Sequence, residues 1–268
     1  MSNATPARNW WLPQEVPQEH TLQCRIGPLS LDVHHARGEW QVAVTRGEET
    51  FAGSMATLTL RGGGIDGETY DRFIVTRPGD ALTLQPLLTD RPVVITPRHS
   101  VFLPSGEEVT LYMSTPATLR LEAGEPPVLL REVASLELSD TWFGPSTREG
   151  ELCYSGRTHA RHSLAEVPLR AHRVTTPVRI RNEVETPLPL DKFSLPVPLL
   201  SVYGAADGRL WTQEVSLVRT SASDMASLKI ADAPPRGLAD AVLVSGPREA
   251  HARGGLVRAF SMLFGDGV

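Results

Sequence analysis

Residues 173–219 form a series of short segments, separated by proline and glycine turns, in which apolar and polar residues alternate. Alternation at a period of two places one face of each strand against a core and leaves the other face in water. The chain also holds 22 prolines spread over its length. Prolines at this density interrupt helices but are compatible with turns and edge strands. The sequence therefore predicts an all-β protein with an antiparallel, sandwich-like architecture.

The N-terminal half continues the pattern. Its candidate strands are residues 38–45, 56–61, 72–76, 81–85, 92–96, 99–103, 109–113, 117–122 and 128–138. Short strands separated by regular turn signals are typical of β-sandwiches. The glycine- and proline-rich turn at 124–127 is the strongest candidate boundary. We predict two sandwich-like lobes, residues 1–127 and 128–268, and one continuous domain would give the same pattern.

The C-terminus carries the only pattern that favours a helix. Its apolar residues fall at the spacing of one helical stripe: Leu256, Ala259, Phe260, Leu263 and Phe264. A glycine pair precedes the stripe and Gly265 follows it, as a C-capping glycine would. We expect a short amphipathic helix that packs on a sheet or docks a partner.

Composition and charge limit the cellular locations and the classes of binding partner that we expect for this protein. The formal net charge is −5, and neither half of the chain is basic, which argues against nonspecific nucleic-acid binding. No apolar segment approaches the roughly 18 residues of a membrane span, and residues 1–9 lack the apolar core of a signal peptide. Cys24 and Cys153 lie far apart and do not suggest an oxidising compartment. We expect a cytoplasmic protein without membrane insertion.

The sequence holds few catalytic or metal-binding motifs, so it gives little support to the hypothesis that the protein is an enzyme. His159 and His162, with His172 as a third ligand, are weak candidates for a metal site. Residues three apart on a strand point to opposite faces, so only a turn or a helix would bring the pair together. The chain has no nucleophile elbow and no phosphate-binding loop. We therefore predict no metal and no cofactor.

Arginines between positions 170 and 181 form the best candidate binding site. Arg179 and Arg181, two apart on one expected strand, share a face, and Arg170 and Arg173 approach from the preceding loop. Guanidinium groups bind phosphate or carboxylate in a bidentate manner, so four converging arginines would form an anion pocket. The alternative is a solvated strand face whose arginines pair with nearby glutamates: Glu166, Glu183 or Glu185.

Several motifs resemble one known family. They are residues 166–170 (EVPLR), 176–182 (TPVRIRN), 195–198 (LPVP), 207–212 (DGRLWT) and 234–235 (PP). Together they are similar to an uncharacterised prokaryotic protein family, domain of unknown function 432, over nearly the whole chain. The resemblance implies no catalytic residue. Members are sometimes encoded near small mechanosensitive channels. The resemblance therefore implies a membrane-channel partner, by analogy alone.

These observations favour a non-catalytic β-sandwich module that binds an anionic ligand or a protein partner through its arginine-rich surface. The alternative is an enzyme acting on a small anionic or sugar-like substrate. In that enzyme His159, His162 or His172 would be the general base.

Overall fold

Strands make up nearly all the regular structure. The computed structural model describes residues 5–50, 54–67, 69–76, 79–97, 101–157, 161–223, 225–235, 237–238, 240–250 and 255–260. Its helical elements are two single 3-10 turns, η1 (Leu164–Glu166) and η2 (Val197–Leu199). In the described part of the chain, no helix is long and apolar enough to cross a membrane. The predicted all-β fold is confirmed.

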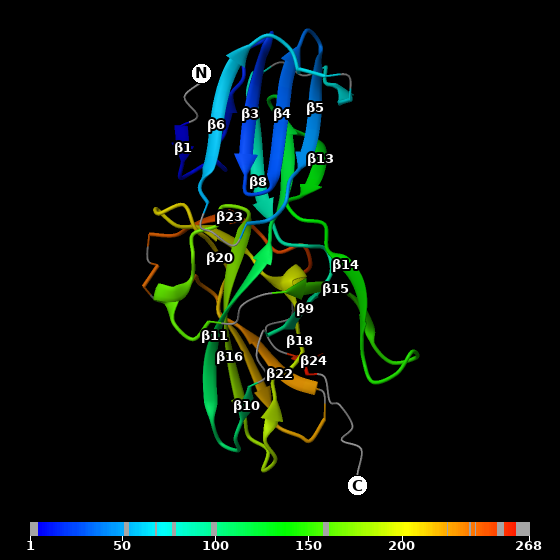
Figure 1. Ribbon diagram of the computed structural model, residues 1–268, viewed down its shortest axis with the longest axis vertical. Coiled ribbons are helices and arrows are strands. Elements are labelled where there is room, and N and C mark those ends of the chain that lie inside the picture. The colour runs from blue at the N-terminus through cyan, green and yellow to red at the C-terminus, as the bar shows by residue number, and fades with distance from the viewer. Residues whose placement is uncertain are drawn as a thin grey trace.

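One end of the molecule is a sandwich of two sheets, which we call the first sandwich (Figure 1). Its larger sheet has the order β1 (Thr5–Ala7), β6 (Ala56–Gly62), β3 (His20–Ile26), β4 (Leu29–Ala36), β5 (Glu39–Arg46) and β7 (Asp71–Ile74). Its smaller sheet has the order β13 (Val128–Ala134), β12 (Thr118–Ala123), β8 (Ala81–Leu87) and β2 (Gln14–Glu15). All pairings in the two sheets are antiparallel, as the alternating sequence pattern leads us to expect.

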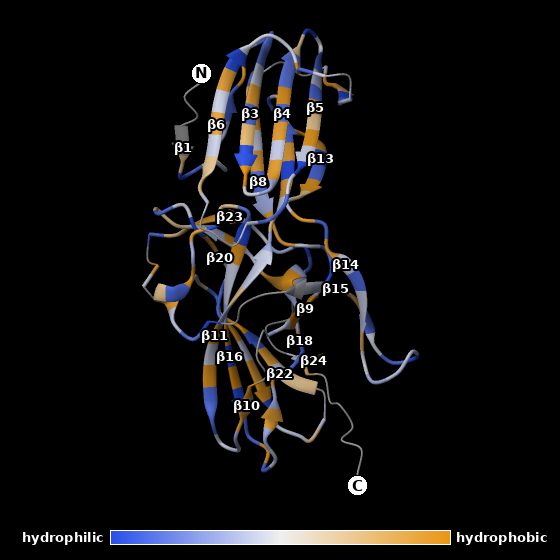
Figure 2. Ribbon diagram, viewed as in Figure 1, coloured by the Kyte–Doolittle hydropathy of each residue, from blue (hydrophilic) through white to orange (hydrophobic). Residues whose placement is uncertain are grey.

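Alternating hydropathy explains how these strands pack (Figure 2). In β4, Leu29, Leu31 and Val33 are fully buried, whereas Ser30 and Asp32 between them are partly exposed. β4 thus gives one row of apolar side chains to the core between the sheets.

The other end is organised around the long strand β16 (Arg173–Asn182). The sheet containing it, here called the central sheet, has the order β23 (Val242–Ser245), β19 (Val202–Gly204), β20 (Leu210–Trp211), β16, β21 (Val215–Arg219), β22 (Met225–Ile230) and β24 (Gly255–Arg258). A further strand, β11 (Glu108–Pro116), pairs with β16 along its whole length.

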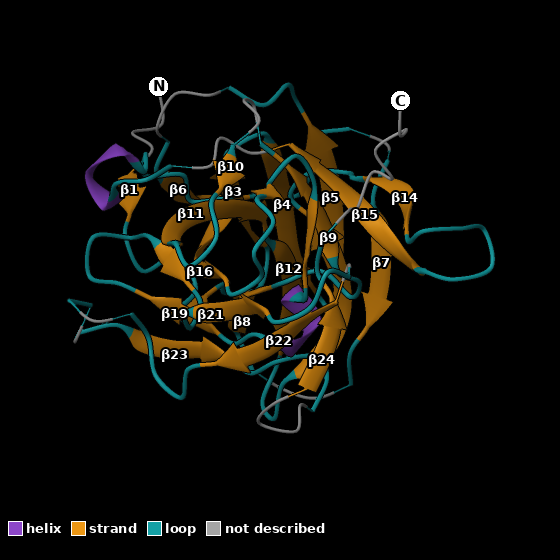
Figure 3. Ribbon diagram, turned by 90° about the horizontal axis from the view of Figure 1, so that it is seen from below, coloured by secondary structure: helices purple, strands orange, loops and turns teal. Residues whose placement is uncertain are grey.

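Two smaller sheets complete this end. One has the order β14 (Ser139–Phe143), β15 (Glu151–Arg157), β9 (Val93–Thr96) and β18 (Phe193–Leu195), and the other joins β10 (Phe102–Leu103) to β17 (Leu188–Pro189). The hairpin of β14 and β15 projects from the side of the molecule (Figure 1, Figure 3).

The central sheet is interrupted at the candidate site. The edge of β16 opposite β11 pairs first with β20, at Val174 and Thr175, and then with β21, from Val178 onward. Residues 212–214 lie between these two strands and outside the ladder. Thr212 stabilises the break, because its hydroxyl group donates a hydrogen bond to the Gln213 carbonyl (2.8 Å) and lies 3.0 Å from the Thr176 hydroxyl group, from which it can accept one.

The chain crosses between the two ends more than once. Residues 93–116 contribute β9, β10 and β11 to the second end, and the chain then returns to the first sandwich for β12 and β13. The predicted boundary after Pro127 lies in the hairpin between β12 and β13, which pair with each other. One hydrophobic cluster contains core residues of both ends, from Leu22 and Leu121 to Val178 and Leu217.

The predicted C-terminal helix is wrong for its described part. Residues 255–258 form β24, which pairs antiparallel with the edge strand β22. Phe260 is buried and bridges to Phe193, whereas Leu256 is 69% exposed. The open edge of β22 supplies backbone hydrogen-bond partners that helical spacing alone does not reveal. Leu263, Phe264 and Gly265 lie outside the described residues.

Candidate functional site

The four arginines of the predicted anion site occupy two separate places. Arg170 and Arg173 are almost fully buried, with side chains 8% and 7% exposed. Both lie near Glu49, which follows β5 of the first sandwich. Arg179 and Arg181 lie further along β16, where the strand becomes exposed. Arg179 lies six positions after Arg173 on the strand, which corresponds to roughly 20 Å, so the four arginines do not converge.

Glu49 is the centre of the buried group. Arg173 donates to both of its carboxylate oxygens, at 2.5 and 2.8 Å, and Nε2 of His172 lies 2.9 Å from Oε1. Burial by itself would raise the pKa of the Glu49 carboxyl group, but the hydrogen bonds from His172 and Arg173 and the charge of Arg173 lower it to about 2. This ion-pair group joins β16 to the first sandwich, which indicates a structural role.

His172 is enclosed on its other side by a glycine. A Cβ atom on Gly27 would lie 2.0 Å from its Nδ1 atom, so only glycine leaves room for the imidazole ring. Gly27 also has a φ of +62°, which favours glycine in the turn between β3 and β4. The His172 side chain is 1% exposed, so a ligand in solvent does not reach it.

Arg179 and Arg181 project from one exposed face, as predicted from their spacing. Arg179 lies between two carboxylates: its Nη2 atom is 2.8 Å from Glu214 Oε1, and its Nε atom is 3.8 Å from Glu108 Oε1. Arg181 pairs with Glu183 at 3.3 Å. The predicted alternative of glutamate pairing therefore describes Arg181 well, while Arg179 belongs to a pocket.

This pocket has a volume of about 550 Å³ and opens on the face of the central sheet. Its floor comes from adjacent strands, because the register of β11 and β16 places Thr110 beside Arg179 and Tyr112 beside Pro177. Trp211 ends β20, and Glu214 is the last residue of the break before β21. The walls are Leu164 of η1 and, after β22, Ala231, Asp232, Ala233, Pro234, Pro235 and Leu238.

Backbone hydrogen bonds hold both walls in place. The Ala231 amide donates to the Glu214 carbonyl at 3.0 Å, which ties the proline-rich segment to the break in the sheet. On the other side, the Tyr112 amide donates to the Arg161 carbonyl at 2.8 Å. Ser163 then caps η1 by accepting from the Ala165 amide, and Leu164 faces the pocket.

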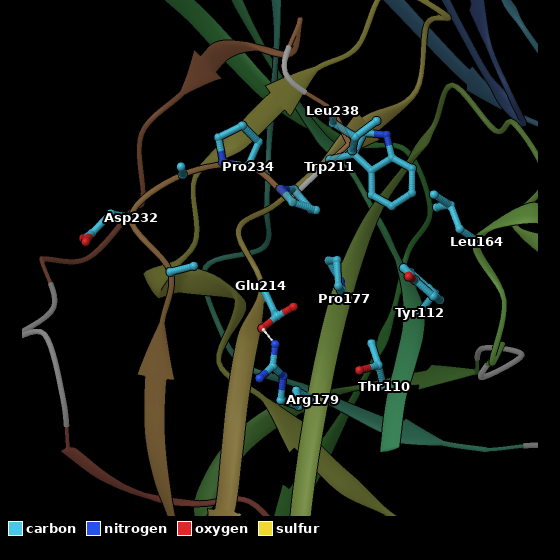
Figure 4. Close-up of a pocket in the computed structure, with 13 residues that line it drawn as sticks. Thr110, Tyr112, Leu164, Pro177, Arg179, Trp211, Glu214, Asp232, Pro234 and Leu238 are labelled. Atoms are coloured by element: carbon cyan, nitrogen blue, oxygen red, sulfur yellow. Dashed lines mark ion pairs between the residues drawn. The ribbon is translucent and has the colours of Figure 1, made fainter. Parts of the chain in front are cut away.

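The pocket has a charged end and an apolar end (Figure 4). The ion pair of Arg179 and Glu214 lies at one end, and Trp211 and Leu238 lie at the other. The side chain of Asp232 points away from the pocket. A volume of this size, apolar walls and a few charged groups are typical of small-molecule sites.

The histidines do not gather at this site. His162 is exposed on the loop before η1, His172 is buried against Glu49, and His159 lies outside the described residues. Among the residues that the structure describes, no three His, Cys, Asp or Glu side chains are grouped to hold a metal ion. Of the described residues that line the pocket at Arg179, none is a histidine.

A second pocket of about 380 Å³ lies beside β24. Its polar residues include Glu151, Ser194 and Arg258, with prolines and Leu256 around them. Burial raises the pKa of the Glu151 carboxyl group, an effect that the hydrogen bond from Ser194 (3.4 Å) partly offsets. This pocket holds none of the arginines that the sequence pointed to.

Sequence reasoning found Arg179 but missed the residues that make its pocket. Tyr112, Glu214 and Leu238 come from three segments that only the folded sheet brings together. One signal in the sequence pointed to this pocket. Trp211 and the proline pair 234–235 lie within two of the motifs that carry the family resemblance.

The fold and the pocket thus define an all-β protein with an open, ligand-sized site on its central sheet. The chain belongs to the family described as "Protein of unknown function (DUF432)", whose model matches residues 10–264. This match confirms the family resemblance predicted from the sequence. No curated protein and no solved structure is significantly similar to the chain.

Proposed function

We propose that the protein is a non-catalytic, cytoplasmic binding module. Its pocket on the central sheet holds a small ligand with an apolar body, and Arg179 pairs with an anionic group of that ligand. Arg170 and Arg173, which the sequence placed in the same site, instead hold β16 to the first sandwich through Glu49.

One observation carries the proposal: Arg179 lies in the lining of a pocket of about 550 Å³ while its side chain stays 44% exposed. Only its Nη2 atom makes a close ion pair within the described part of the chain. The guanidinium group has five N–H donors in a planar fork, so it can bind a ligand carboxylate and keep its contact with Glu214.

Cytoplasmic location is supported by the cysteines. Cys24 and Cys153 are both buried and free, and burial raises the pKa of each thiol, that of Cys153 to about 12. Two buried, unpaired thiols fit a reducing compartment. Measuring the distribution of the tagged protein between cell fractions tests this assignment.

The binding proposal is tested with a simple aromatic acid, 3-phenylpropanoate, by isothermal titration calorimetry. Arg179→Gln should weaken its binding by about tenfold or more, because a hydrogen-bonded charge pair is lost. Arg179→Lys, which keeps the charge but not the fork, should weaken it less.

Two matched variants serve as controls. Arg72→Gln removes an exposed arginine of the first sandwich, and Arg181→Gln removes one on the same strand face outside the pocket lining. Neither should change binding more than about twofold, and neither Arg179→Gln nor Arg181→Gln should shift the melting temperature much, since both side chains are about half exposed. Equal binding by wild type and Arg179→Gln would refute the proposal.

A further inference from the structure

The charges around Arg179 do not favour a simple anion as its natural ligand. Among the residues that the structure describes, two carboxylates flank Arg179, Glu214 at 2.8 Å and Glu108 at 3.8 Å. A ligand that carries only a negative charge is attracted by Arg179 and repelled by both glutamates. A ligand with a positive group next to its negative group meets a partner for each.

The spacing of the protein charges sets the spacing of the ligand charges. Arg179 and Glu214 are in direct contact, so ligand groups that pair with them have to be close neighbours as well. An ammonium and a carboxylate on one carbon atom meet this condition. The two ends of a peptide are separated by at least one further residue, which moves the charges apart.

The rest of the pocket fits an apolar side chain. From the charged end, the lining continues over Pro177 and Tyr112 toward Trp211 and Leu238 (Figure 4). The rings of Pro177, Tyr112 and Trp211 offer apolar surface against which such a side chain can pack. The Glu214 backbone is held by Ala231, independently of its carboxylate, so this carboxylate can accept a hydrogen bond from a ligand while it stays beside Arg179.

We propose that the pocket recognises the zwitterionic head of a free α-amino acid with an apolar side chain. Arg179 binds the carboxylate, Glu214 binds the ammonium group, and the side chain lies against Tyr112, Pro177 and Trp211. This inference rests on the proposed function and goes beyond it by naming the ligand class and the second recognition residue.

Three probes that share one phenyl group test it: phenylalanine, 3-phenylpropanoate without the ammonium group, and 2-phenylethylamine without the carboxylate. For the wild type, calorimetry should give phenylalanine an affinity about tenfold higher than either of the others, because a charged hydrogen bond is lost in each.

Glu214→Gln should then affect the binding of phenylalanine and of 3-phenylpropanoate differently. The affinity for phenylalanine should fall by about tenfold, because its ammonium group loses the Glu214 carboxylate as a partner. The affinity for 3-phenylpropanoate should stay unchanged or increase, because a repulsive charge is removed. A general loss of structure would weaken both, and an unchanged melting temperature serves as the control for folding.

The outcomes separate the two proposals. If phenylalanine and 3-phenylpropanoate bind equally, and Glu214→Gln affects them equally, the amino-acid inference is wrong, although Arg179-dependent binding of the acid would still support the proposed function. If Arg179→Gln leaves binding of the acid unchanged, the proposed function itself fails. Tighter binding of 2-phenylethylamine than of phenylalanine would also overturn the inference, because it would show that the carboxylate contributes nothing.

Discussion

At the scale of single residues, the same side-chain type serves two purposes on β16. Arg173 is buried and forms a bidentate ion pair with Glu49, whereas Arg179 is half exposed at a pocket. Burial decides the difference, because a buried guanidinium group needs fixed partners and an exposed one can exchange a partner for a ligand. Residue type alone therefore did not separate the buried, ion-paired arginines from the arginine at the pocket.

Glu49 gives a prediction about pH. Its pKa is lowered to about 2 in the folded protein, against an ordinary value of 4.5. A lowered folded-state pKa stabilises the protein fully above the unfolded value, and this contribution is lost as the pH falls from about 5 toward 2. We expect Glu49→Gln to cost about 3 kcal/mol at pH 7.

Urea unfolding of wild type and Glu49→Gln at pH 7 and at pH 3 measures this. The difference in unfolding free energy should shrink markedly at pH 3, where the wild-type contribution is mostly lost. Glu166→Gln, at an exposed glutamate of η1, should show no difference at either pH. A difference that stays constant with pH would mean that the Glu49 charge does not stabilise the fold.

At the scale of elements, strand pairing overrides local spacing. The stripe from Leu256 onward fits a helix, but β22 presents an open edge, and residues 255–258 complete it as β24. A helix would bury Leu256 and Phe260 together, while the strand exposes Leu256 and buries Phe260.

Two alanine substitutions distinguish these arrangements. Phe260→Ala should cost about 3–5 kcal/mol, as loss of a buried phenyl ring does. Leu256→Ala should change stability by no more than about 0.5 kcal/mol, because the side chain is largely exposed. The measurement is chemical unfolding, and similar large losses for both variants would favour the helix.

At the scale of the whole molecule, the two ends are connected by more than the chain. Arg248 binds Glu132 of β13 at 2.7 Å, and the Ser245 hydroxyl group donates to the carbonyl of Pro86 in β8 at 2.7 Å. These contacts add to the Glu49 group and to the shared hydrophobic cluster. The two ends therefore depend on each other for part of their packing.

We expect the chain to unfold in one cooperative transition. Tryptophans lie at both ends, with Trp40 in β5 and Trp211 in β20, so fluorescence reports on the whole molecule. Urea curves followed by fluorescence and by far-ultraviolet circular dichroism should coincide. Two separate transitions would show instead that the two ends fold as independent domains.

Alternation and turn residues were enough to predict the all-β fold class and many of the strands. The runs at 38–45, 56–61, 81–85 and 109–113 became β5, β6, β8 and β11, because alternation and turn residues are local properties of the chain. The shared face of Arg179 and Arg181 followed from the same period of two. The prediction did not include the hairpin of β3 and β4 around Gly27, nor several further strands, among them β14, β15, β22 and β23.

Which residues lie next to one another could be seen in the folded chain alone. It paired Glu49 with Arg173 and placed Tyr112, Trp211 and Leu238 around Arg179, although these residues are far apart in the chain. It also returned the chain to the first sandwich for β12 and β13, across the boundary expected at residue 127. Such contacts depend on sheet order and on burial, and these arise from the sum of many weak interactions along the whole chain, which no single segment encodes.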